Sequence, residues 1–277
     1  TSDRLVAARP VALPGADATG AARLSVTSGG VDRPYLLAPA RRTGARARPA
    51  LLVLLPAANT TLRAEYDRYG LDALRDHGLT VLVAGTYAAS WNAGSCCGRP
   101  RREGIDDVAA LVAMRDDALR RSGADPDRVA VAGHSVGALM AWRLACTPAF
   151  RAAAVVAVSG TLVHPCPSPL TRTPRVLLLN GDLDTTVPVD GSDRVVTVLG
   201  VAPPSVRESV LRLAASGRCG PAVSRRVEDG LVQDHPGCTG GGSVRFQLVR
   251  GQGHPWDGLQ ATRRLAAFLA EALTGVR

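Results

Sequence analysis

The sequence predicts an α/β fold: a mostly parallel central sheet of about eight strands, flanked by helices. Two observations carry this prediction. Short runs of Val, Leu and Ala alternate with longer stretches of helical periodicity, which is typical of a parallel sheet covered by helices. The run 50–56 is apolar without interruption, as expected of a strand that is covered on both faces. A chain of 277 residues suits one such unit, so we expect 1–277 to form a single domain.

Each element follows from its own residue pattern. The first two expected strands should be antiparallel edge strands, and the later ones should alternate with helices. The expected strands are 24–27, 35–38, 50–56, 79–85, 129–132, 153–158, 176–180 and 244–249. The expected helices are 62–76, 105–121, 136–146, 205–215 and a closing helix around 265–273. A glycine-rich excursion, about 217–243, interrupts this alternation.

The chain is strongly basic, and all of its 33 basic residues are arginine, which gives a net charge of +9. Such a charge raises the question of a polyanionic partner. The densest cluster consists of Arg41, Arg42, Arg46 and Arg48, without interleaved aromatic residues or a nucleic-acid-binding pattern. No apolar run approaches the roughly 18 residues of a membrane span. We therefore expect neither nucleic acid nor a membrane as a partner, and we interpret the cluster as a solvated loop.

Six cysteines occur without any C-x-x-C spacing, which favours disulfides over a metal site or a dithiol redox motif. Because disulfides persist in oxidising compartments, we expect an exported protein. The start at Thr1 fits a mature chain whose signal peptide has been removed. The alternative is a cytosolic protein with six free thiols. The cysteines are Cys96, Cys97, Cys146, Cys166, Cys219 and Cys238.

A candidate nucleophile lies in the stretch VAVAGHSVGALMAW, where Ser135 stands between Gly133 and Gly137. A strand-like run precedes this G-x-S-x-G pattern and a helix-like run follows it, as in a sharp strand-to-helix turn that exposes a serine hydroxyl. Glycine is needed on both sides because a Cβ there would crowd the neighbouring elements. The alternative is a serine that only caps the helix. The context favours a nucleophile.

A nucleophilic serine needs a base and an orienting acid, which follow it in the order serine, acid, histidine in enzymes of this pattern. Among five histidines, His254 is the one placed directly after an expected core strand, 244–249. The loop after strand 176–180 offers Asp182 and Asp184, and the pattern alone leaves both open.

An oxyanion hole would take one N–H from Val136, the residue after the nucleophile. The second N–H should come from the loop after strand 50–56. Ala58 and Asn59 are the candidates there, because Pro56 has no N–H.

At this point several stretches resemble secreted esterases related to polyhydroxybutyrate depolymerases and feruloyl esterases, over roughly 51–256. The loop SWNAGSCCG (90–98) is the most specific of them. GIDDVAALVAMRD, DPDRVAVAGHSVGALMAWRLAC, NGDLDTTVP and GQGHPWDG resemble the other motifs of that family. Two departures stand out: Pro56-Ala57 replaces a usual His-Gly, and Val136 replaces a common Asn.

The resemblance implies an α/β-hydrolase fold without a large lid domain, and a catalytic set of Ser135, Asp184 and His254. It matches Ala58 to the second oxyanion donor. It also places Trp91 in the substrate cleft and Trp256 on the opposite wall, with core packing as the alternative for each ring. Asn59 is a further candidate for substrate binding.

The cysteines can then be paired. Cys219 and Cys238 are expected to close a loop around the excursion. Because a bridge between the adjacent Cys96 and Cys97 would strain their shared peptide, each is expected to pair with Cys146 or Cys166.

The function expected from the sequence is a secreted serine carboxylic-ester hydrolase that acts on a small or polymer-linked ester. A feruloyl esterase is the first choice, because no polymer-binding module follows the last helix. The alternatives are a polyester depolymerase, an acyltransferase with the same triad, and a non-catalytic binding protein. No metal or organic cofactor is implied, and a monomer is expected.

Overall fold

The computed structural model describes residues 5–8, 11–44 and 47–274. Its strands are β1 (Leu5–Ala7), β2 (Ala22–Ser28), β3 (Val31–Ala38), β4 (Arg42–Gly44), β5 (Ala50–Leu55), β6 (Leu79–Ala84), β7 (Val129–His134), β8 (Ala154–Val158), β9 (Arg175–Gly181), β10 (Val223–Val227), β11 (Gly230–Cys238) and β12 (Gly242–Val249). Its helices are α1 (Leu62–Arg68), α2 (Gly98–Arg102), α3 (Asp107–Ser122), α4 (Val136–Ala145), α5 (Val206–Ser216) and α6 (Ala261–Thr274). Short 3-10 helices are η1 (Leu71–His77), η2 (Pro148–Phe150) and η3 (Thr239–Gly241).

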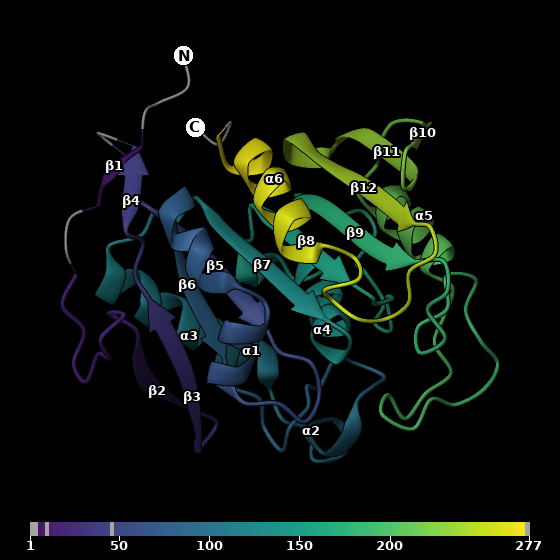
Figure 1. The fold of residues 1–277 in the computed structure, drawn as a ribbon. Coiled ribbons are helices and arrows are strands. Elements are labelled where there is room, and N and C mark those ends of the chain that lie inside the picture. Colours follow the sequence, from purple (N-terminus) through teal and green to yellow (C-terminus); the bar gives the residue numbers. More distant parts are fainter. Residues whose placement is uncertain (1–4, 9–10, 45–46, 275–277) are drawn as a thin grey trace.

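The main sheet has ten strands in the order β10-β11-β12-β9-β8-β7-β5-β6-β3-β2 (Figure 1). The six strands from β12 to β6 are parallel, and antiparallel strands extend the sheet at both ends. The predicted mostly parallel sheet is therefore confirmed. It is wider than expected because β10 and β11 form a hairpin beside β12, within the segment interpreted as an excursion.

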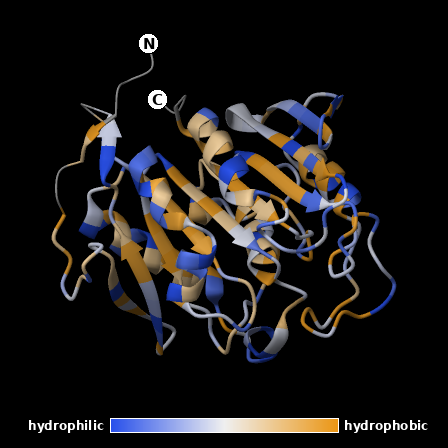
Figure 2. Cartoon of the chain, viewed as in Figure 1, coloured by the Kyte–Doolittle hydropathy of each residue, from blue (hydrophilic) through white to orange (hydrophobic). Residues whose placement is uncertain are grey.

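Helices cover both faces of the sheet, and the middle strands are apolar along their length (Figure 2). On one face, α3, α4 and α5 pack side chains such as Leu111, Trp142 and Leu213 into one buried cluster. On the other face, α1, η1 and α6 contribute Tyr66, Leu74 and Leu265 to a second cluster. This double cover explains why the central strands read as uninterrupted apolar runs. In the described part of the chain, no helix is long and apolar enough to span a membrane.

The expected helix 62–76 is two elements. Helix α1 begins at the N-cap Thr61, whose hydroxyl accepts from the Ala64 N–H, and it ends at Arg68. Gly70 then takes a left-handed conformation, with φ of 60°, and η1 follows. A left-handed residue cannot continue a right-handed helix, so the glycine turns the chain although the apolar spacing runs on.

The three disulfides correct part of the sequence prediction. Cys219–Cys238 is present as expected. Cys96 and Cys97 are bonded to each other, which leaves Cys146 to pair with Cys166, so the predicted crossing pairs are wrong. The expectation had excluded this bridge because of strain in the shared peptide. The peptide between Cys96 and Cys97 is cis, and their Cα atoms are 3.1 Å apart.

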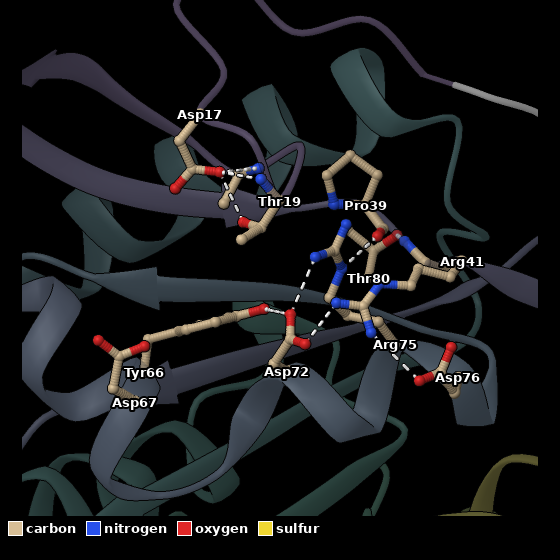
Figure 3. A network of polar contacts seen from close by, with 12 residues as sticks. Asp17, Thr19, Pro39, Arg41, Tyr66, Asp67, Asp72, Arg75, Asp76 and Thr80 are labelled. Carbon is tan, nitrogen blue, oxygen red and sulfur yellow. Dashed lines mark hydrogen bonds and ion pairs between the residues drawn. The ribbon is translucent and has the colours of Figure 1, made fainter.

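Two arginines of the cluster, Arg41 and Arg48, contact other parts of the chain, and Figure 3 shows the contacts of Arg41. Arg41 forms ion pairs with Asp72 and Asp76 of η1, and Arg75 also donates to Asp72. Although burial opposes it, hydrogen bonds from Arg41, Tyr66 and Arg75 hold the pKa of Asp72 below its usual range. Arg48 donates to two backbone carbonyls of the loop after α3, and Arg46 lies outside the described residues. Arg41 thus holds its part of the chain against η1, and Arg48 holds its part against the loop after α3.

Candidate active site

Ser135 lies on the sharp turn between β7 and α4. Its backbone has φ of 56° and ψ of −123°, which is unusual for a residue with a side chain. A Cβ on Gly133 would lie 2.2 Å from the Gly137 carbonyl oxygen, and one on Gly137 would lie 2.1 Å from that of Leu55. Both glycines are therefore required by close packing. Ser135 occupies the N-cap position of α4, but its side chain makes no capping hydrogen bond, so capping does not explain it.

His254 and Asp184 meet at the same edge of the sheet, from the loops after β12 and β9. The His254 Nδ1 atom is 2.9 Å from Asp184 Oδ2 and 3.1 Å from Oδ1. The Asp184 side chain is fully buried, and its Oδ1 also accepts from the N–H groups of Thr186 and Val187. A carboxylate held in this way fixes Nδ1 as the protonated nitrogen of a neutral ring and leaves the Nε2 lone pair free.

The structure separates the two aspartates that the pattern left open. Asp182 is exposed and accepts from the Gly251 N–H at 2.6 Å, while the His254 ring contacts Asp184. The two loops cross closely, because the Leu183 N–H donates to the Gln252 carbonyl and a Cβ on Gly181 would lie 2.0 Å from that oxygen. The glycine that ends β9 thus lets the histidine loop reach Asp184.

Ser135 and His254 come from neighbouring parts of this edge. His134 precedes Ser135, and its ring centroid is 5.1 Å from that of His254. Within the described residues, no hydrogen bond joins the Ser135 hydroxyl to the His254 ring. Such contacts are often long in free enzymes and tighten when substrate binds.

The loop after β5 offers one of its two candidate N–H groups. The Asn59 N–H donates to the Ala89 carbonyl at 3.2 Å, so it is already used. Ala58, half-buried and one residue closer to β5, is then the remaining candidate. Val136 is the first residue of α4, and a first-turn N–H has no acceptor within its own helix. The side chain of Asn59 is exposed, so it remains a prediction for substrate binding.

The two tryptophans predicted to line the cleft are core residues. Trp91 is fully buried and its Nε1 donates to the Pro56 carbonyl at 3.0 Å. Trp256 is 1% exposed, stacks on Tyr69 at 4.2 Å, and donates from Nε1 to Thr262. Rings without exposed surface cannot form the walls of an open cleft. The core-packing alternative is therefore the correct one for both.

Two cavities border loops that follow strands of the sheet. One, of about 480 Å³, is bordered by Pro56 and by Thr60, which flank the candidate oxyanion loop. Its other walls come from Arg23, Pro34, Leu36, Thr61, Leu62, Arg63, Ala84, Gly85 and Thr86. The second, of about 530 Å³, lies between 162–166 and the end of α5. The first cavity is the one that borders the candidate oxyanion loop, and Ser135, Asp184 and His254 line neither cavity.

Sequence reasoning missed two buried polar residues behind the site, His134 and Tyr69. His134 is 4% exposed, and burial lowers its pKa to about 4. The Tyr69 hydroxyl lies 2.8 Å from His134 Nδ1. His134 stands inside the G-x-S-x-G pattern, so its position was visible, but its partners lie 65 and 120 residues away along the chain.

A mostly parallel sheet in this strand order, with helices on both faces, is the α/β-hydrolase fold. No protein-family model matches the chain. A curated relative, "Putative esterase NocK" of Nocardia uniformis subsp. tsuyamanensis, is 32% identical over 269 residues, which cover 88% of this chain and 76% of the relative. The chain belongs to this esterase family.

Solved structures of low sequence identity share the fold. Acetyl xylan esterase from Aspergillus awamori has a TM-score of 0.63 and 14% identity, over 90% of this chain and 99% of that one. Esterase PE8 has a TM-score of 0.53 and 22% identity, over 86% and 97% of the two chains. A thermostable esterase has a TM-score of 0.55 and 15% identity, and this chain covers 62% of its length.

Proposed function

We propose that this protein is a serine carboxylic-ester hydrolase with Ser135 as nucleophile, His254 as base and Asp184 as the orienting acid. The observation that carries the proposal is the placement of Ser135 on a positive-φ turn, at the sheet edge where His254 contacts a buried Asp184. This constellation of nucleophile, base and orienting carboxylate is recognised by its geometry on many folds.

In the proposed reaction, Ser135 Oγ attacks the ester carbonyl carbon while His254 Nε2 takes the hydroxyl proton. The N–H groups of Val136 and Ala58 stabilise the oxyanion, each contributing about 3 kcal/mol by comparison with other oxyanion holes. The C–O bond to the alcohol breaks, and His254 returns the proton to the leaving oxygen. Water then attacks the acyl-enzyme by the same route and releases the acid and free Ser135.

For the substrate, we propose hydroxycinnamoyl esters of the plant cell-wall type, as the resemblance implies. Trp91 and Trp256 are buried, so these rings give no support for an aromatic acyl group, and the preference rests on the resemblance. The cavity beside Pro56 would hold part of the acyl or alcohol group. Polyester hydrolysis and acyl transfer to an alcohol are the competing outcomes of the test below.

The test is hydrolysis of methyl ferulate, short p-nitrophenyl esters and a polyhydroxybutyrate suspension by the wild type, Ser135→Ala and Ser224→Ala. Ser224 is exposed on β10 and serves as the matched serine control. We expect Ser135→Ala to lose at least about 10⁴-fold in kcat, as nucleophile removal does in related triads. The control should keep the wild-type rate. Ester hydrolysis that survives in Ser135→Ala would refute the proposal.

We also propose that the protein works outside the cytoplasm. Three disulfides that include all six cysteines favour an oxidising compartment. A reporter fused after residue 277 should be recovered from the medium or the periplasm of the source organism. Recovery from the cytoplasm with free thiols would contradict this.

A further inference from the structure

Buried hydrogen bonds connect His134, the residue before Ser135, to Tyr69 and to the backbone of His254. His134 Nε2 is 2.9 Å from the backbone carbonyl oxygen of His254. A carbonyl oxygen can only accept, so Nε2 carries the hydrogen and donates it. In the neutral ring Nδ1 then holds a lone pair, and the Tyr69 hydroxyl at 2.8 Å donates to it. The carbonyl acceptor fixes the direction of the first hydrogen bond, and the neutral state of the ring fixes the second.

These bonds hold the backbone of the proposed base. The His254 carbonyl oxygen accepts a second hydrogen bond, from Ser159 Oγ at 3.0 Å. His134 ends β7 and Ser159 follows β8, so two adjacent parallel strands anchor the same carbonyl. His134 is also the residue before Ser135. A shift of its ring would move the base relative to the nucleophile.

Tyr69 is itself held rigidly. Its ring is fully buried and stacks on Trp256, two residues after His254, with an interplanar angle of 17°. Its backbone carbonyl accepts from the Thr262 hydroxyl, which in turn accepts from Trp256 Nε1. Tyr69 therefore joins the turn after α1 to the loop that carries His254.

The ionisation of both rings supports this direction of bonding. Burial lowers the pKa of His134 to about 4, and burial, together with the nearby Glu65, raises the pKa of Tyr69 above its ordinary value. Near neutral pH, His134 is then a neutral ring and Tyr69 keeps its proton. The titratable and charged groups that act on His134 include Arg68 from α1, Asp184 after β9 and His254 after β12, and Glu65 of α1 acts on its partner Tyr69.

We propose that His134 and Tyr69 are positioning residues for His254: His134, as the neutral Nε2–H tautomer held by the Tyr69 hydroxyl, fixes the backbone of the base at its carbonyl. Neither residue contacts the reacting atoms. This inference rests on the proposed esterase function, because it assigns what the two residues do for that reaction.

The test compares His134→Gln, His134→Leu and Tyr69→Phe. The Gln amide nitrogen can replace Nε2 as donor to the His254 carbonyl, whereas Leu has similar bulk and no donor. We expect His134→Leu to lower kcat about tenfold to a hundredfold with KM little changed, as small misplacements of catalytic groups do. His134→Gln should recover most of that loss. Tyr69→Phe should fall between the wild type and His134→Leu.

A second readout does not depend on activity. In protein labelled with ¹⁵N-histidine, one of the five histidines should remain neutral and protonated at Nε2 at pH 5.5. Its signal should vanish in His134→Gln and shift in Tyr69→Phe. A doubly protonated ring or an Nδ1–H tautomer for His134 would overturn the proposal. So would an unchanged kcat in a folded His134→Leu, or Gln and Leu variants that are equally slow.

The two failures can be told apart. Ester hydrolysis that does not depend on Ser135 refutes the proposed function, and the positioning role falls with it. Ser135-dependent hydrolysis that is indifferent to His134→Leu refutes the positioning role alone. Urea unfolding of each variant identifies any loss of rate that comes from loss of folded protein.

Discussion

Asp182 and Asp184 lie two residues apart on one loop, yet their carboxylates have different partners. Asp184 is buried against His254 Nδ1, while Asp182 accepts a backbone N–H from Gly251 near the surface. Residue type and spacing could not separate them, because both follow the same strand. The two aspartates differ because the loop after β9 crosses the loop after β12, and this crossing brings Asp184 into contact with His254 Nδ1.

We predict that Asp184→Asn lowers kcat by about 10⁴-fold, as the same change does in a serine protease triad, because the amide favours the wrong histidine tautomer. The matched control is Asp182→Asn, which should stay within a few-fold of the wild type. Steady-state kinetics on a p-nitrophenyl ester measures both. Equal losses in the two variants, or a larger loss in the control, would contradict the assignment.

His134 predicts a pH dependence of stability. Its pKa is lowered by burial from an ordinary 6.5 to about 4 in the folded chain. Between these values the unfolded chain binds a proton that the folded chain does not, so stability is present above pH 6.5 and falls as the pH approaches 4. The full effect is about 3 kcal/mol.

Urea unfolding of the wild type and His134→Gln at pH 7.5, 6 and 5 checks this. Glutamine does not titrate, so the stability advantage of the wild type over the variant should shrink on acidification. Curves that stay parallel from pH 7.5 to 5 would show that His134 is not the group responsible.

At the scale of elements, the segment 90–98 supports the turn after β5. The Trp91 Nε1–H donates to the Pro56 carbonyl, and the Asp107 carboxylate accepts from the Asn92 N–H at 2.6 Å. Asp107 is in turn ion-paired with the buried Arg33 at 2.7 Å. The start of α3 and strand β3 thereby fix the loop from which the Ala58 N–H would act.

We predict that Trp91→Phe lowers the free energy of unfolding by about 1–3 kcal/mol, because it leaves the buried Pro56 carbonyl without its donor. It should also reduce kcat more than it raises KM. Trp142→Phe is a matched control: that ring is equally buried, but its Nε1 has no hydrogen-bond partner in the described part of the chain. The control should lose less stability and little activity. Equal effects on kcat would mean that ring volume, not the hydrogen bond, matters.

Sequence patterns predict the buried strands of the sheet but not the exposed strand β10. The apolar runs predict the central strands closely, since β5, β7, β8 and β9 are buried along almost their whole length. Strand β10 escapes prediction because its residues, Val223–Val227, are mostly exposed and include Arg225 and Arg226. Its pairing with β11, rather than any burial of its own, makes it a strand.

The candidate site was predictable where one local motif determines it, and not where distant contacts do. Ser135 and His254 follow from a turn and from their place after core strands. The inward packing of Trp91 depends on a carbonyl 35 residues away, and the partners of His134 are also remote. Such contacts between distant residues cannot be inferred from the sequence. The sequence therefore could not decide whether the tryptophan rings pack in the core or line a cleft.

For the molecule as a whole, the sheet order assembles the site. Strands β12, β9, β8, β7 and β5 are consecutive neighbours and parallel, so their carboxyl ends meet at one edge. The proposed base follows β12, the acid follows β9, the nucleophile follows β7 and the oxyanion loop follows β5. Ligand sites of such sheets lie at this edge. Residues more than a hundred positions apart converge without a second domain in the described structure.

The two long disulfides stabilise the side of the molecule that carries β8, α5 and β11. Cys146, at the end of α4, is bonded to Cys166 over 20 residues, and Cys219, after α5, is bonded to Cys238 over 19. Loops of such similar length should restrict the unfolded chain similarly, by about 3 kcal/mol each in the loop-entropy model.

We predict that replacing either pair of cysteines by serine lowers the free energy of unfolding by that amount. Replacing both should lower it by about twice as much if the sites are independent. Denaturant unfolding measures these values, with non-reducing peptide mapping of the wild type to verify the pairs. An unchanged midpoint in either double variant would mean that its bridge does not restrict the unfolded chain.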